Sequence, residues 1–117
     1  MVDLDRIEQS KKTTLMIKNI PNKYSKQLLL EEINARFAGK YDFFYLPMDF
    51  QNNCNLGYAF INFVCLKAIR DFYQQFHGQK WNQFNSDKIC QIKYARIQGK
   101  EEFEEHLKES TTMKHSD

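Results

Sequence analysis

The sequence predicts an α+β fold of the ferredoxin-like type: a four-stranded antiparallel sheet with two helices on one face, followed by a short C-terminal helix. Three observations lead to this prediction. The chain has 117 residues, which is enough for one hydrophobic core and short for two ordinary domains. Four segments have the composition or alternation of strands, and two others repeat apolar residues at helical spacing. Their order along the chain is β-α-β-β-α-β.

The first predicted strand covers residues 14–20, where apolar and polar side chains alternate before Pro21 introduces a turn. A helix follows, with Ser25 as its N-cap, because a serine hydroxyl can accept a hydrogen bond from the first helical turn. The helix stops before Gly39, since glycine readily adopts the left-handed conformation found after a last turn. Its apolar residues recur every four positions: Leu29, Ile33 and Phe37.

Two more strands are predicted in the middle of the chain. Residues 43–46 are apolar and aromatic and are closed by Pro47, so they form the second strand. Residues 50–55 are rich in asparagine, which favours turns, and we expect a loop there. Residues 57–63 form the third strand.

The second helix has an apolar stripe and ends at Gly78. The stripe consists of Ile69, Phe72 and Phe76. Residues 89–96 form the fourth strand. The intervening residues 81–87 have no clear pattern, and we expect Trp81 and Phe84 to form a satellite core under this loop rather than to contact a ligand.

These elements divide the chain into four parts. Residues 1–12 are a polar N-terminal extension, and residues 13–100 are the main domain. Residues 101–109 are expected to form a short helix because glutamates crowd its first turns. Residues 110–117 are expected to be a disordered tail.

Several classes of protein are excluded by composition. Three cysteines without paired spacing, Cys54, Cys65 and Cys90, argue against a disulfide framework and fit a reducing compartment. The histidines form no metal-ligand pattern with them, and no dinucleotide or phosphate-binding glycine motif is present. No apolar run reaches the roughly 20 residues that span a bilayer, and the first residues do not resemble a signal peptide. We therefore expect a soluble intracellular monomer, in the nucleus or cytoplasm, without membrane contact, metal or cofactor.

Charge is distributed unevenly along the chain. Residues 11–100 carry 14 Lys and Arg against 6 Asp and Glu, a net of +8, whereas residues 101–117 carry a net of −4. A basic body with an acidic end favours a polyanionic partner for the body.

The strongest motif is on the third strand, where residues 56–63 read LGYAFINF. Apart from Leu56 and the conservative Ile61, they match the octamer K/R-G-F/Y-G/A-F-V-x-F/Y of the RNA recognition motif. Because side chains alternate across a strand, Tyr58 and Phe60 share the face that no helix covers. Exposed neighbouring rings stack unpaired bases, each worth about 1–3 kcal/mol. The alternative is that both rings pack under another element, such as the terminal helix.

A closer resemblance extends over most of residues 13–100. It rests on five strings: TTLMIKNIPNKY (13–24), YDFFYLPMDF (41–50), NLGYAFINF (55–63), GQKWNQFNS (78–86) and YARIQGK (94–100). They resemble the RNA recognition motif in the C-terminal part of the Mei-two-like meiosis regulators, and NIPNKY, DFFYLP and YARIQGK are specific to that variant. The resemblance implies single-stranded RNA as ligand and a role in meiotic or developmental RNA control.

The first strand carries two further candidate binding residues. Met16 stands where the motif usually has an aromatic ring. The Mei-two-like variant, which this strand resembles, also has methionine at this position, and the thioether can pack against a base. Alternatively, the Met16 side chain only fills space beside the C-terminal tail; the sequence favours neither role over the other. Lys18 lies on the same face of the strand, in reach of a phosphate.

Three more candidates come from the neighbouring strands. Leu56 replaces the Lys or Arg of the octamer, and the lost charge should weaken electrostatic affinity unless Lys18, Lys93 and Arg96 compensate for it. Lys93 and Arg96 belong to the last strand and its exit, and the alternative for these two is an ordinary solvated edge. By analogy with the family fold, Tyr45 lies on the open face beside the third-strand rings, although a one-residue bulge would reverse its direction.

The terminal helix has two apolar residues, Phe103 and Leu107, that need an apolar surface to cover. We expect it either to dock beside or across the sheet, extending or masking the RNA surface, or to pack on the side of the domain. The rival function is a protein-interaction module that uses the same sheet face for a partner peptide or subunit, which Leu56 and Met16 favour. No acid, base or nucleophile constellation indicates an enzyme.

Overall fold

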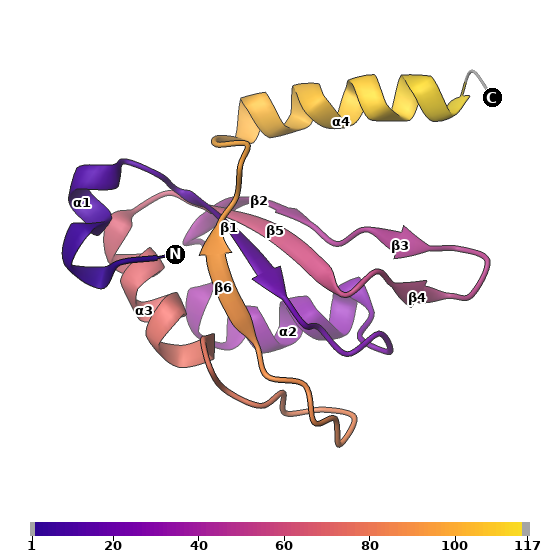
Figure 1. Cartoon of the computed structure of the whole chain (residues 1–117), viewed down its shortest axis with the longest axis horizontal. Helices are drawn as coiled ribbons and strands as arrows, with labels where there is room; N and C mark the ends of the chain where they lie inside the picture. Colours follow the sequence, from indigo (N-terminus) through magenta and orange to yellow (C-terminus); the bar gives the residue numbers. More distant parts are fainter. Residues whose placement is uncertain (1, 116–117) are drawn as a thin grey trace.

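The four-stranded sheet has the strand order β2-β5-β1-β6 and is antiparallel throughout. The structure is a computed structural model that describes residues 2–115, with side chains as far as residue 109. The strands are β1 (Thr14–Lys18), β2 (Tyr41–Tyr45), β5 (Tyr58–Phe63) and β6 (Gln91–Tyr94). Figure 1 shows α2 (Lys26–Phe37) and α3 (Leu66–Phe76) below the sheet and α4 (Lys100–His115) above it. This is the predicted ferredoxin-like arrangement.

Alternation along the two central strands separates a core face from an open face. Leu15 pairs with Ile61 and Ile17 with Ala59, and these four residues are buried against the helices. The residues between them, on the opposite face, also pair: Met16 with Phe60 and Lys18 with Tyr58. The face that sequence alternation assigns to Tyr58 and Phe60 is therefore confirmed.

The helix α2 begins after the predicted cap Ser25, and α2 and α3 end before Gly39 and Gly78, as predicted. The Ser25 hydroxyl accepts a hydrogen bond from the Leu28 N–H at 3.0 Å, which caps α2. Gly39, just beyond α2, has φ +77°, a conformation that other residues adopt at a cost. The apolar stripes of α2 and α3 are buried in the core: Leu29, Ile33, Phe37, Ile69, Phe72 and Phe76.

The two aromatic residues expected to form a satellite core between α3 and β6 behave differently: Trp81 is buried as part of the main core, whereas Phe84 is 41% exposed. The Tyr24 ring lies 5.4 Å from Trp81 and 5.2 Å from Phe84, between ring centroids. The Trp81 indole N–H donates to the Asn19 carbonyl at 2.8 Å, so the loop is fixed to the end of β1. Burial raises the pKa of the Tyr24 hydroxyl, and its hydrogen bond to Glu32 raises it further.

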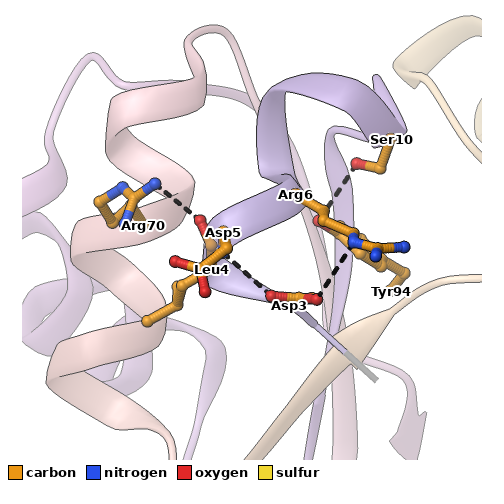
Figure 2. A network of polar contacts seen from close by, with 7 residues as sticks. All are labelled: Asp3, Leu4, Asp5, Arg6, Ser10, Arg70 and Tyr94. Carbon is orange, nitrogen blue, oxygen red and sulfur yellow. Dashed lines mark hydrogen bonds and ion pairs between the residues drawn. The ribbon is translucent and has the colours of Figure 1, made fainter.

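The N-terminal residues were expected to be a polar extension, and this is wrong in part. They form η1 (Leu4–Arg6) and α1 (Ile7–Ser10), and Val2 and Ile7 are buried in the core. Figure 2 shows how Arg70 of α3 donates to the Leu4 carbonyl, at 2.6 Å. Two apolar residues in a polar segment are enough to attach it, because each is fully covered on docking.

Two other expectations need correction. The asparagine-rich loop contains a short two-stranded ribbon, β3 (Met48–Asp49) and β4 (Cys54–Asn55), which extends beyond the sheet in Figure 1. The terminal helix, expected at residues 101–109, continues to His115, so most of the expected tail is helical; residues 116–117 lie outside the described part. Neither glycine nor proline follows Gly99, so the sequence has no residue that would end the helix earlier.

Among residues 2–115, no helix is long and apolar enough to cross a membrane. Within the same residues, no group of three or more His, Cys, Asp or Glu side chains could hold a metal ion.

Candidate nucleic-acid interface

A groove of about 720 Å³ lies between the open face of the sheet and α4. Its lining combines aromatic, aliphatic and basic side chains from segments far apart in the sequence. The lining residues are Lys12, Met16, Tyr45, Pro47, Leu56, Tyr58, Phe60, Lys93, Tyr94, Ala95, Arg96, Ile97, Phe103, His106 and Leu107. Six of the seven residues proposed from sequence are therefore together; the seventh, Lys18, is not part of the lining.

The aromatic pair of β5 forms the floor of the groove. The rings of Tyr58 and Phe60 are 5.7 Å apart between centroids and meet edge to face. Both side chains are half-buried, and Met16 lies beside Phe60 on β1. These residues have the arrangement expected of a stacking platform, but one of them is already covered.

Phe103 of α4 packs directly on this platform. Its ring centroid lies 4.6 Å from that of Phe60 and 5.1 Å from that of Phe43, and only 3% of Phe103 is exposed. Of the two arrangements left open by the sequence, the terminal helix adopts the one across the sheet. Tyr58 and Phe60 both line the groove, and Phe60 also supports α4 through its contact with Phe103.

The second strand contributes Tyr45, which pairs with Phe60 across the sheet and lines the groove. An irregularity in pairing between Tyr41 and Phe43 precedes this pair. Because this irregularity lies before Phe43, the side chains from Phe43 onward alternate regularly. Phe43 and Tyr45 therefore face α4, and Phe44 packs against the core. The bulge that would have reversed Tyr45 does not occur at its position.

Basic side chains line the groove at the β6 edge. Lys93 pairs with Met16 on the open face, and Arg96 follows the strand; both are exposed. Lys18 is on the same face, opposite Tyr58 in the pairing, at the other end of β1. An aromatic floor beside exposed cations suits a ligand with planar groups on a negative backbone.

Lys12 also lines the groove, although no sequence pattern selects it. Its ammonium nitrogen lies 5.5 Å from the centroid of the Tyr94 ring, a cation–π contact. The Ser10 hydroxyl lies 3.2 Å from the Tyr94 hydroxyl, a hydrogen bond drawn in Figure 2. The N-terminal helix thus fixes the position from which Lys12 reaches the groove.

The base of α4 is fixed to β1 by one glutamine. The side-chain oxygen of Gln98 accepts from the N–H groups of Thr13 and Thr14, each at 2.9 Å. Its amide nitrogen donates to the carbonyl oxygens of Thr14 and Ala95, at 2.9 and 2.7 Å. The Gly99 N–H, just before the helix, donates to the Thr14 hydroxyl at 2.8 Å. Gln98 belongs to the string YARIQGK, but nothing in that string by itself indicates which groups the side chain binds.

This network continues across the sheet, from β1 through β5 to β2. The Thr14 hydroxyl donates to the Asn62 side-chain oxygen at 2.7 Å, and the Asn62 amide donates to Asp42 at 2.8 Å. The polar groups of the buried residues Thr14 and Asn62 are therefore satisfied, which favours one fixed geometry for the start of α4.

The sequence and the fold are similar to those of known proteins. The model of the family described as RNA recognition motif 2 matches residues 12–108. The chain is 51% identical to Protein MEI2-like 2 of Oryza sativa subsp. japonica over 114 residues, which is 96% of this chain and 13% of that protein. It is 50% identical to Protein MEI2-like 1 of Arabidopsis thaliana, over 96% of this chain and 12% of that protein. The chain thus spans only a small part of the length of these relatives.

Solved structures show the same fold at low identity. The Rna15 RRM with bound RNA (GU) matches with a TM-score of 0.62 and 18% identity, covering 80% of this chain and 95% of that one. A Sex-lethal protein/RNA complex matches with a TM-score of 0.59 and 20% identity, covering 77% of this chain and 50% of that one.

Proposed function

The chain belongs to the RNA recognition motif 2 family, in the form shared by MEI2-like proteins, and from that premise we propose that it binds single-stranded RNA in the groove between its sheet and α4. Two of the solved structures that share its fold, those of Rna15 and Sex-lethal, contain RNA.

One observation carries the proposal: the aromatic and basic side chains chosen from the sequence line a single groove. Tyr45 and Tyr58 offer flat rings to bases, and Lys93 and Arg96 offer charge to phosphates. Base stacking on an aromatic ring contributes about 1–3 kcal/mol per base, and each neutralised phosphate adds a salt-dependent contribution. A groove with both elements can hold a short segment of unpaired strand.

The two rings of the octamer have different roles in this proposal. Tyr58 stacks a base, whereas Phe60 supports α4 through Phe103. His106 and Leu107 of α4 line the opposite wall, so a base on Tyr58 lies between the sheet and the helix rather than on an open platform.

The test is fluorescence anisotropy with a randomised single-stranded RNA dodecanucleotide. Tyr58→Ala should weaken binding by about 1–3 kcal/mol because it removes one stacking ring. Tyr73→Ala is the matched control: Tyr73 is half-buried too, but it stacks on His77 at the helical side of the domain. Circular dichroism and thermal unfolding identify any variant that loses its fold.

Equal affinity of Tyr58→Ala and the wild type would refute RNA binding on this floor. If the wild type binds neither RNA nor single-stranded DNA at low salt, the same groove is a site for a protein partner, the function that exposed Leu56 favours. A role in meiotic or developmental RNA control is a separate proposal, supported by the resemblance to MEI2-like proteins alone.

A further inference from the structure

The β3–β4 ribbon presents one large apolar side chain to solvent. Phe50, at the turn between the two strands, is 82% exposed, the largest exposed fraction among the large apolar residues described. No ring of another described residue packs against it, in contrast to Phe84, which is also exposed but contacts Tyr24. A phenylalanine this exposed contributes little to the stability of the fold.

The turn that carries Phe50 has a fixed shape. One carboxylate oxygen of Asp49 accepts from the N–H groups of Gln51 and Asn52, at 3.0 and 3.3 Å. The other accepts from the Asn52 side-chain amide at 2.7 Å. These bonds hold the pKa of Asp49 below its usual value, and they direct its charge into the turn rather than toward a ligand.

The ribbon is also attached firmly to the body of the domain. The buried Asn55 side chain donates to the carbonyl oxygens of Pro21 and Tyr24, each at 2.9 Å, and accepts from the Gly57 N–H at 2.7 Å. Both ends of this side-chain amide are thus bonded to backbone groups of three other residues. The backbone that carries Phe50 is therefore held in place and is not a free loop, so little backbone entropy is lost when Phe50 binds.

The ribbon continues the groove. Pro47 and Leu56 immediately flank its two strands, both line the groove, and the Leu56 N–H donates to the Pro47 carbonyl at 3.0 Å. Leu56 is 51% exposed and is two residues from Tyr58. Phe50 is three residues beyond Pro47, a reach of about 10 Å in extended chain. The ribbon thus forms a path from Leu56 at the groove to Phe50 at its turn, with mainly polar residues between them.

Charge beside this path favours RNA over an apolar peptide. Lys23 is exposed in the turn next to Asn22, whose carbonyl accepts from the Asn55 N–H at 3.2 Å. A cation therefore lies at the base of the ribbon, beside the route to Phe50, where a phosphate of an emerging strand can be neutralised.

We propose that Phe50 is a second base-stacking residue, which holds the RNA strand where it leaves the groove past Leu56. The inference rests on the proposed function and extends it, because it assigns the ribbon to the RNA surface and gives this domain a longer binding site than its sheet.

The test compares two lengths of randomised single-stranded RNA, a tetranucleotide and a dodecanucleotide, by fluorescence anisotropy. Phe50→Ala should weaken dodecanucleotide binding about fivefold or more while leaving the tetranucleotide unchanged. Phe50→Trp should retain the affinity, because tryptophan also offers a flat ring. Val64→Ala is the control: Val64 is another exposed apolar residue, 58% exposed, and lies just before α3, outside the groove.

A second measurement uses the fluorescence of the tryptophan that Phe50→Trp introduces, since the native tryptophan of the chain, Trp81, is buried. The dodecanucleotide should quench the exposed tryptophan, whereas an unchanged spectrum at saturation contradicts the proposal. If Phe50→Ala binds the dodecanucleotide like the wild type while Tyr58→Ala loses affinity, the ribbon has no part in RNA binding, although the groove does. If Tyr58→Ala also binds normally, the proposed function itself fails.

Discussion

The ring of Phe103 lies 4.6 Å from the ring of Phe60, between centroids, and packs against it at an interplanar angle of 49°. Phe60 is the ring that the octamer motif would assign to RNA. A residue of the terminal helix has taken its exposed face, which leaves Tyr58 as the octamer ring for stacking. The relation between these two phenylalanines leads to the first prediction.

Removing the flat ring of residue 60 should affect RNA binding only when α4 is absent. In the full chain, Phe60→Leu keeps an apolar contact for Phe103 and should change RNA affinity by less than about 0.5 kcal/mol. In a chain that ends at Gly99, Phe60 is uncovered, and the same substitution should cost about 1–3 kcal/mol. Anisotropy titrations of the four proteins measure this coupling. An equal effect in both lengths would mean that α4 does not cover Phe60 in solution.

The Gln98 side chain should be important for stability, although it is only half-buried. Gln98→Ala leaves the N–H groups of Thr13 and Thr14 without their acceptor, at a cost of about 2–3 kcal/mol in the free energy of unfolding. Urea denaturation measures it, with Gln91→Ala, an exposed position on β6, as the control. A loss of less than about 0.5 kcal/mol would show that water replaces these bonds.

Salt dependence should report the contribution of Lys12. If Lys12 neutralises one phosphate, Lys12→Ala should reduce the slope of log K against log salt by about 0.7. Lys67→Ala, at an exposed position of α3, should leave the slope unchanged. The titrations need several salt concentrations, and an unaltered slope for Lys12→Ala would place this lysine outside the RNA path.

Alkaline pH should destabilise the domain through the Cys90 thiol. Burial raises the pKa of this thiol from 9.0 to about 12 in the folded state. Well below pH 9.0 the thiol is protonated in both the folded and the unfolded chain, so the free energy of unfolding does not depend on pH through this group. Above pH 9.0 the unfolded chain loses the proton first, and unfolding is favoured. Between these two values stability should fall by about 1.4 kcal/mol per pH unit from this group. The raised pKa of Tyr24 acts in the same direction at higher pH.

Thermal unfolding at several pH values measures this effect. Cys90→Ala should make the decline above pH 9.0 shallower, because the titrating group is gone. The exposed Cys65 is the control, since Cys65→Ala should leave the pH dependence as it is. The prediction fails if Cys90→Ala and the wild type decline in parallel up to the onset of tyrosine ionisation.

The sequence alone determined the elements and the face to which each strand residue belongs. Alternation on β5 put Tyr58 and Phe60 on the open face, and spacing of four put Leu29 and Ile33 in the core. Such predictions succeed because the period of a strand or helix is a local property, read from neighbouring residues. The exceptions were the N-terminal helical turns, the β3–β4 ribbon and the end of α4. The first two are short elements with little periodic signal, and a helix without a stop residue has no local signal for its last turn.

Only the tertiary structure decided what each face contacts. Phe103 meets Phe60 across 43 positions of sequence, Gln98 binds Thr14, and Ser10 fixes Tyr94 beside Lys12. None of these pairs has a periodic signal, because each depends on how separately formed elements dock. The sequence thus identified six of the fifteen residues that line the candidate site. The docking of α4 and of the N-terminal helix determined which other residues join them and which of the rings α4 contacts.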